Sequence, residues 1–120
     1  MRLCIAGGPK TGKTTLAATL GLPVKHTDDA LDLGWSEASA EVASWMSLPG
    51  PWVIEGVAVP RGLRKWLAAN PGRPCDKVIW LDTPRVDTTP AQDAMAKGAL
   101  TVMAQILPEL HARGVAFEVR

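Results

Sequence analysis

The sequence predicts an α/β fold with a parallel sheet, formed by a single domain over residues 1–120. Five short apolar segments of strand character alternate along the chain with segments of helical periodicity, as parallel sheets require. A glycine-rich turn joins the first strand to the first helix. No internal repeat, low-complexity tract or linker divides the chain, so we expect all the strands in one sheet.

The first half of the chain alternates strand and helix between clear stop signals. The helical segment 15–20 ends at Gly21 with Pro23 just beyond it. Large apolar residues at 35, 42, 45 and 46 follow a helical period and predict a helix over 35–46. The break Leu-Pro-Gly-Pro at 48–51 ends this helix.

The second half continues the alternation with two longer helices. One begins at Pro60 and stops at Asn-Pro-Gly, residues 70–72. The other begins at the quartet Thr-Pro-Ala-Gln, residues 89–92, a capping box with proline at the first helical position. Its pattern runs toward His111, and we expect interruptions at Gly98 and Pro108. The predicted strands cover 3–6, 24–27, 52–54, 78–81 and 115–119.

The turn after the first strand carries the most specific motif. Residues 7–14, Gly-Gly-Pro-Lys-Thr-Gly-Lys-Thr, fill every fixed position of G-x-x-x-x-G-K-[ST], the phosphate-binding P-loop. In this motif backbone N–H groups and a helix N-terminus face the phosphates. Lys13 would reach the β- and γ-phosphates, and the Thr14 hydroxyl would ligate Mg²⁺. The residues predicted to contact a nucleotide are Gly8, Pro9, Lys10, Thr11, Gly12, Lys13, Thr14 and Thr15.

Three carboxylates follow the second and third predicted strands. Carboxyl ends of parallel strands meet at the ligand-binding edge of such a sheet. Asp28 or Asp29 could there take the proton of an acceptor hydroxyl during phosphoryl transfer. Glu55 could hold Mg²⁺ through its hydration shell. The simpler interpretation makes the aspartates loop acids or helix caps and the glutamate a surface residue.

Basic residues suggest contacts to phosphates. Arg61 and Arg64 follow the third strand on the expected ligand side, and could bind the acceptor or stabilise the transition state. Arg85 and Lys97 are candidates for a mobile lid over the phosphates. For most other charges in the basic segment 61–77 and the acidic segment 27–41, a solvated face is the simpler interpretation.

Aromatic, histidine and cysteine residues are expected to be mainly structural. Trp35 could stack on a base, although packing is the simpler interpretation. The two histidines have no metal-ligand pattern around them. The cysteines are expected to be buried, reduced thiols. The residues concerned are Trp45, Trp66 and Trp80 in the core, His26, His111, Cys4 and Cys75.

Composition limits the classes of partner and location. A formal charge of +1 gives no general attraction to nucleic acid or anionic membranes. No apolar run approaches the roughly 20 residues of a membrane span. The chain leads from Met1 directly into its first strand, without the features of a signal peptide. We therefore expect a cytoplasmic protein that does not bind membranes.

The motifs together resemble those of P-loop kinases, the group that includes nucleoside-monophosphate, shikimate, gluconate and polynucleotide kinases. The resemblance rests on the P-loop, Asp28-Asp29, Ile54-Glu55-Gly56 and Pro60-Arg61. It implies a P-loop NTPase three-layer sandwich with sheet order 2-3-1-4-5, and ATP with Mg²⁺. It also implies that Asp28 is the base and that Arg61 and Glu55 serve the acceptor side.

More narrowly, the chain resembles small phage-encoded P-loop kinases, including those that phosphorylate 5-hydroxymethyluracil within phage DNA. This resemblance implies DNA as the substrate, a host-cytoplasmic location, residues 61–77 along the DNA path and Trp35 on an extruded base. Two alternatives stay open. One is a nucleotide, polynucleotide-end or small-metabolite kinase, and the other is a nucleotide-binding regulatory module without catalysis. The sequence leaves the oligomeric state open.

Overall fold

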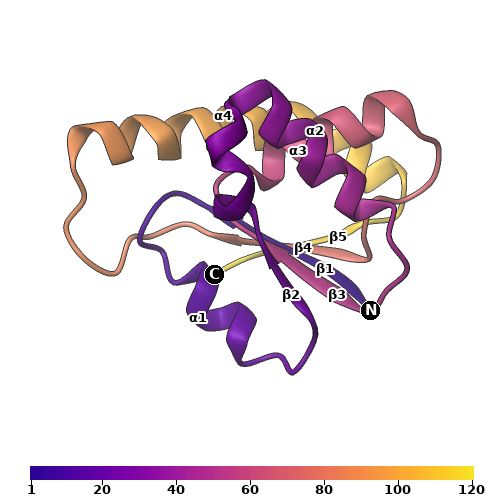
Figure 1. Ribbon diagram of the computed structural model, residues 1–120, viewed down its shortest axis with the longest axis horizontal. Helices are drawn as coiled ribbons and strands as arrows, with labels where there is room; N and C mark the ends of the chain where they lie inside the picture. Colours follow the sequence, from indigo (N-terminus) through magenta and orange to yellow (C-terminus); the bar gives the residue numbers. More distant parts are fainter.

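The strands form one fully parallel sheet in the order β2-β3-β1-β4-β5 in a computed structural model that describes residues 1–120 (Figure 1). The α/β class and the strand order are as expected. The elements are β1 (Arg2–Gly7), α1 (Lys13–Ala18), β2 (Val24–His26), the 3-10 helix η1 (Thr27–Leu33), α2 (Trp35–Met46), β3 (Trp52–Glu55), α3 (Val59–Ala69), β4 (Lys77–Leu81), α4 (Pro90–Ala112) and β5 (Ala116–Val119).

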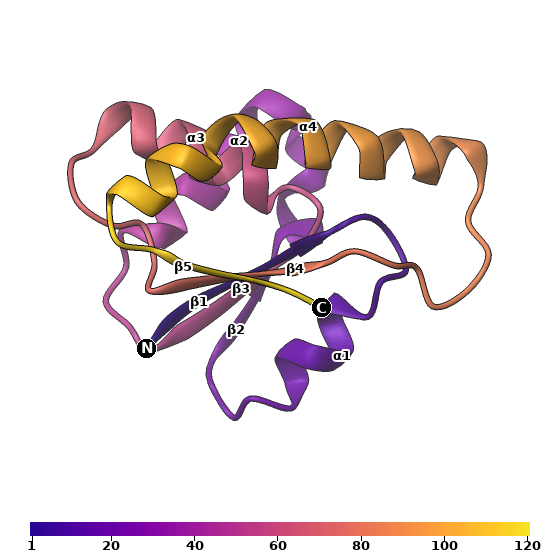
Figure 2. The same ribbon diagram turned by 180° about the vertical axis from the view of Figure 1, so that it is seen from behind.

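Helices cover the two faces of the sheet unequally. Helix α1 lies on one face, and α2, α3 and α4 lie on the other (Figures 1 and 2). Alternate residues of β1 therefore face different clusters: Leu3 and Ile5 pack on the α1 side, and Cys4 and Ala6 join the larger core under the other helices. The result is three layers, with the larger part of the core on the side of α2, α3 and α4.

Helix α4 is continuous, and the expected interruptions at Gly98 and Pro108 are wrong. Its buried stripe explains why: Ala99, Val102, Met103, Ile106 and Leu110 all face the core, and their packing outweighs the local cost of glycine and proline. None of the helices, α4 included, combines the length and the hydrophobicity needed to cross a membrane.

The buried tryptophans and cysteines largely follow expectation. Trp66 and Trp80 are buried in the core. Trp45, expected in the core, is only half-buried at its edge, and the Lys25 ammonium lies 5.4 Å from its ring centroid. Cys4 and Cys75 are buried free thiols, as expected, and the pKa of Cys4 is raised by its hydrogen bond with Cys75 and by burial.

Gly56, at the end of β3, permits a very close approach between β3 and the start of η1. Its φ is +146°, and a Cβ atom there would lie 1.7 Å from the Thr27 hydroxyl. We expect Gly56→Ala to lower the free energy of unfolding by about 3 kcal/mol or more, measured by urea denaturation, because strain and overpacking combine.

Gly72→Ala is the matched control. Gly72 also has a positive φ, +84°, but no atom lies within 4 Å of its ideal Cβ. This variant is expected to lose only about 1 kcal/mol, the cost of the left-handed conformation. Equal losses in the two variants would show that the contact with Thr27 is not what requires glycine at position 56.

Candidate active site

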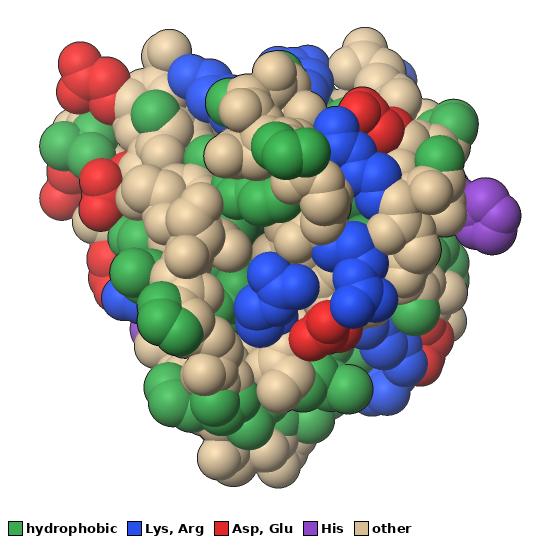
Figure 3. Space-filling model, turned by 90° about the vertical axis from the view of Figure 1, so that its right-hand side faces the viewer, with side chains coloured by type: hydrophobic (Ala, Val, Ile, Leu, Met, Phe, Trp, Pro, Cys, Tyr) green, Lys and Arg blue, Asp and Glu red, His purple; other side chains and the backbone are tan.

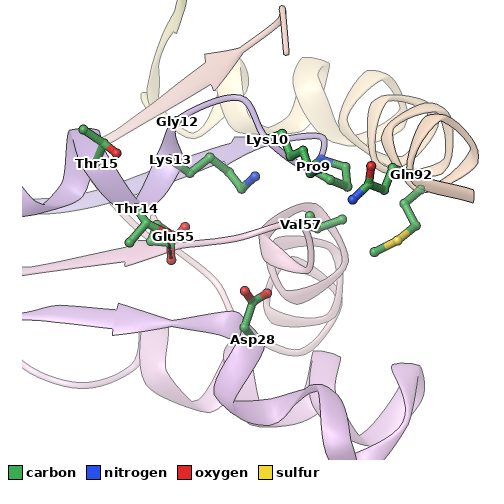
Figure 4. A pocket seen from close by; sticks show the side chains of 11 residues that line it. Pro9, Lys10, Gly12, Lys13, Thr14, Thr15, Asp28, Glu55, Val57 and Gln92 are labelled. Carbon is green, nitrogen blue, oxygen red and sulfur yellow. Dashed lines mark hydrogen bonds between the residues drawn. The ribbon is translucent and has the colours of Figure 1, made fainter. Parts of the chain in front are cut away.

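A cleft of about 400 Å³ opens where β1, β2 and β3 end, between the glycine-rich loop (residues 7–14) and the N-terminal part of α4 (Figure 4). Most of the residues that line it have polar side chains. The lining residues are Pro9, Lys10, Gly12, Lys13, Thr14, Thr15, Asp28, Glu55, Val57, Gln92 and Met95.

The glycine-rich loop is contacted from two sides, at Gly8 and at Gly12. A Cβ atom on Gly8 would lie 2.4 Å from Cβ of Ala96 in α4. A Cβ atom on Gly12, whose φ is +92°, would lie 2.6 Å from Nε of Arg85. The backbone N–H of Arg85 also donates to the carbonyl of Lys10 at 2.8 Å. The loop is thus fixed between α4 and the segment after β4.

Lys13 places its ammonium group inside the glycine-rich loop. The side chain is buried, and Nζ donates to the Gly8 carbonyl at 2.6 Å and lies 3.5 Å from the Thr11 hydroxyl. Burial lowers the pKa of Lys13, and the nearby carboxylates of Glu55 and Asp28 oppose that shift. The Lys13 ammonium therefore lies at the place where the loop would enclose a bound anion.

Glu55 joins the loop to the neighbouring strand. Glu55 is 2 % exposed, so the free-energy cost of burying its carboxylate depends on its hydrogen-bond partners. Oε1 accepts a hydrogen bond from the Thr14 hydroxyl at 3.1 Å and lies 2.6 Å from Nδ1 of His26. An ionised carboxylate can only accept, which assigns the proton of the second contact to Nδ1.

The sequence predicts a structural role for His26; in the structure it lies outside the cleft wall and contacts Glu55, which lines the cleft. It is the last residue of β2 and pairs in register with Glu55 of β3. Parallel pairing therefore brings the imidazole beside the carboxylate. The position of His26 two residues before Asp28, at a strand end, is the signal that could have identified it.

The structure separates the two adjacent aspartates. Both lie in the first turn of η1, which begins at Thr27, where the sequence predicted the end of a strand. Asp28 lines the cleft, and its carboxylate points into it, across from Lys13 (Figure 4). Asp29 is exposed and is not part of the cleft wall. Asp28 is thus the aspartate of the pair in a position to meet a ligand.

Arg61 and Arg64 lie outside the cleft wall. Trp35 is 43 % exposed, and the guanidinium carbon of Arg61 lies 4.7 Å from the centroid of its ring. Arg64 donates to the side-chain oxygen of Gln105 in α4 at 3.2 Å. A Cβ atom added to Gly98 of α4 would lie 3.1 Å from the Arg61 guanidinium, so Arg61 reaches α4. The Trp35–Arg61 pair therefore lies outside the cleft wall.

The two candidate lid residues do not line the cleft either. Arg85 contacts the glycine-rich loop from outside and borders a second hollow of about 230 Å³, together with Thr11 and Arg120. Lys97 is an exposed residue of α4. The residues of α4 that line the cleft are instead Gln92 and Met95, in the first two turns of the helix.

A DNA path along residues 61–77 requires that this basic segment form one surface with the cleft. The segment does not form such a surface. Lys77 is the first residue of β4 and pairs with Leu3 of β1, at the end of the strands opposite the glycine-rich loop. There Lys77 pairs with Glu118 at 2.6 Å and Arg73 with Asp76 at 3.7 Å. The pKa of Glu118 falls to about 2, through its hydrogen bonds from Arg120 and Lys77. Figure 3 shows the interleaved charges on this face.

No protein-family model matches this chain, and a search of curated proteins finds no match. The chemistry of the site therefore rests on its geometry. One cleft combines a buried ammonium, a hydroxyl bonded to a buried carboxylate, and a second carboxylate across the opening.

Proposed function

We propose that this chain is a kinase that transfers the terminal phosphate of ATP, with Mg²⁺, to an acceptor hydroxyl. The observation that carries the proposal is that Lys13, Thr14, Glu55 and Asp28 line one cleft although they belong to three separate segments. On this proposal the glycine-rich loop is a P-loop and the three-layer fold is that of a P-loop NTPase.

The residues present fit both ATP and Mg²⁺. The Thr14 hydroxyl and the Glu55 carboxylate, 3.1 Å apart, are the oxygen donors that Mg²⁺ prefers. A loop with close packing at Gly8, a left-handed glycine at position 12 and a buried lysine inside it suits a polyphosphate. When bound, Mg²⁺ neutralises charge on the phosphates.

Each residue then has a distinct task. Lys13 exchanges its hydrogen bond with the Gly8 carbonyl for one to a phosphate oxygen and offsets the negative charge there. Asp28 accepts the proton of the acceptor hydroxyl as the phosphoryl group arrives. Val57 and Met95 supply the apolar part of the wall and keep water away from the reacting groups.

Among acceptors, we propose first the hydroxymethyl group of 5-hydroxymethyluracil in DNA. The exposed ring of Trp35, with Arg61 against it, favours a planar acceptor that can stack. Arg73 and Lys77 lie at the opposite end of the strands, and the Lys65 ammonium is bonded to Ser36. Arg61 and Arg64 are therefore the residues of the basic segment that we propose for the DNA backbone. Nucleotides, polynucleotide 5′ ends and small metabolites are the alternative acceptors.

Transfer from γ-labelled ATP with Mg²⁺ tests the proposal. The acceptors are DNA with hydroxymethyluracil, unmodified DNA, DNA with 5′-hydroxyl ends, and free nucleosides and nucleotides. Label on the modified base is the expected result. Label on 5′ ends alone would reject a base as the acceptor. ATP binding without label on any acceptor would instead favour a regulatory nucleotide-binding module.

His26 is expected to position Glu55 for the metal. His26→Ala should raise the Mg²⁺ concentration needed for half-maximal ATP binding by about tenfold, because residues that orient a metal-binding carboxylate contribute on that scale. His26→Asn keeps an N–H donor near the position of Nδ1 and should restore most of the affinity. Fluorescence titration with Mg²⁺ at fixed ATP measures both.

The matched control is His111→Ala, since His111 is exposed in the last turn of α4, away from the cleft. It should bind Mg²⁺ and ATP as the unchanged protein does. If His26→Ala also behaved in that way, the contact at 2.6 Å would have no role in metal binding.

A further inference from the structure

The capping box at the start of α4 fixes the orientation of the Gln92 side chain. The backbone N–H of Thr89 donates to Oε1 of Gln92 at 2.9 Å, and the Gln92 N–H donates to the Thr89 hydroxyl at 3.2 Å. Because a backbone N–H can only donate, the side-chain atom that faces it must be the amide oxygen. The amide nitrogen is therefore directed away from the cap.

That nitrogen faces the cleft. Gln92 lines the cleft, and its Nε2 points toward Pro9 of the glycine-rich loop (Figure 4). The two N–H groups of Nε2 donate to no acceptor in the protein, whereas Oε1 is already engaged by Thr89. A side chain that is held by one end thus presents two free donors to the space above the loop.

The support for this side chain is rigid. Helix α4 touches the loop where Gly8 meets Ala96, four residues after Gln92, and a single added carbon would not fit between them. Arg85 and Lys97, the cations expected in this role, do not line the cleft. Among the residues of α4, Gln92 alone offers the cleft a hydrogen-bond donor, since the other lining residue of the helix is Met95.

We infer that Nε2 of Gln92 donates a hydrogen bond to the terminal phosphate of the bound nucleoside triphosphate, from the α4 side of the cleft. The inference rests on the proposed function, because it requires that the cleft hold the nucleotide's phosphates. It identifies a neutral amide, rather than an arginine, as the group that contacts this phosphate from α4. Amide N–H donors bind phosphate oxygens without adding charge, so the contact reads the presence of the terminal phosphate.

Three variants separate the donor from the helix cap. Gln92→Met has similar length and no donor. Gln92→Glu keeps an acceptor for the Thr89 N–H but replaces the donor with a second carboxylate oxygen. Thr89→Ala removes the hydroxyl half of the capping box and leaves the amide in place. Calorimetric titration of each full-length variant with ATP and with ADP, in Mg²⁺, gives the affinities.

The expected result is selective for the triphosphate. Gln92→Met should lose about three- to tenfold in affinity for ATP and less than about twofold for ADP, the difference of one hydrogen bond. Gln92→Glu should lose more than about tenfold for ATP, since a carboxylate would face the phosphate. Thr89→Ala should stay within about twofold for both nucleotides, because a cap contributes to the helix and not to the ligand.

Equal ATP affinity in Gln92→Met and the unchanged protein would overturn the inference. Equal losses for ATP and ADP would also overturn it, because the contact would then not involve the terminal phosphate. A loss in Thr89→Ala as large as in Gln92→Met would assign the effect to the cap. If the unchanged protein bound neither nucleotide, the proposed function itself would fail, which is a distinguishable result.

Discussion

Lys13→Met is expected to lower the rate of phosphoryl transfer at least about a hundredfold, the usual effect of removing one preorganised donor from a charged transition state. The ammonium is buried inside the glycine-rich loop and bonded to the Gly8 carbonyl at 2.6 Å. Methionine has a similar length and carries no charge. The affinity for ATP should fall as well, because the lysine contacts phosphate in the ground state.

Steady-state transfer from γ-labelled ATP and a calorimetric ATP titration measure the two effects. Lys65→Met is the control: its ammonium lies on α3, bonded to the backbone oxygen of Ser36, outside the cleft. It should retain transfer. Wild-type rates in Lys13→Met would remove the glycine-rich loop from the mechanism.

Asp28→Asn is expected to reduce transfer by about a hundredfold or more while ATP affinity changes only a few-fold, because the amide cannot accept the hydroxyl proton. The carboxylate points into the cleft across from Lys13 (Figure 4), and it makes no hydrogen bond to the loop that would hold the phosphates. The effect should therefore appear in kcat and not in nucleotide binding. Single-turnover transfer with saturating ATP measures it.

Two neighbouring acids sharpen this test. Asp32→Asn changes an exposed acid of the same 3-10 helix and should transfer phosphate at the normal rate. Asp29→Asn should resemble it, because Asp29 is outside the cleft wall. If Asp28→Asn kept its activity and Asp29→Asn lost it, the base would be Asp29, and η1 would have to rearrange when the acceptor binds.

Sequence patterns predicted the architecture because the relevant signals are local. Each strand is a short apolar run, and each helix has its own periodicity and stop, so the alternation that defines a parallel sheet is visible in the chain. The strand order came from a family resemblance, not from the pattern. The continuity of α4 was missed because Gly98 and Pro108 disfavour a helix locally, whereas packing of the buried stripe is a tertiary effect.

The candidate site was predictable only where its residues follow one another or end a strand. The loop 7–14, Asp28 and Glu55 meet this condition, and all three contribute to the cleft. His26 also ends a strand, but its contact with Glu55 depends on the β2–β3 register, which the sequence does not show. Gln92 was recognised as a cap, but its second role depends on where α4 lies over the loop.

The positions of two arginines show a further limit of prediction from sequence. Arg61 and Arg85 were placed near the ligand by their distance from strand ends. In the structure one packs on Trp35 and the other approaches Gly12 from outside the cleft. Long side chains can turn toward any nearby partner, and the sequence does not specify which.

The cleft is proposed to bind the phosphates of a nucleotide together with a metal ion, and every other proposed step depends on this claim. Calorimetric titration with ATP, with and without Mg²⁺, tests this claim directly, before any acceptor is known. We expect one ATP per chain, a dissociation constant between about 1 μM and 1 mM, and clear weakening when Mg²⁺ is removed. Absence of binding by ATP and GTP at millimolar concentration, in the presence of Mg²⁺, would contradict the account.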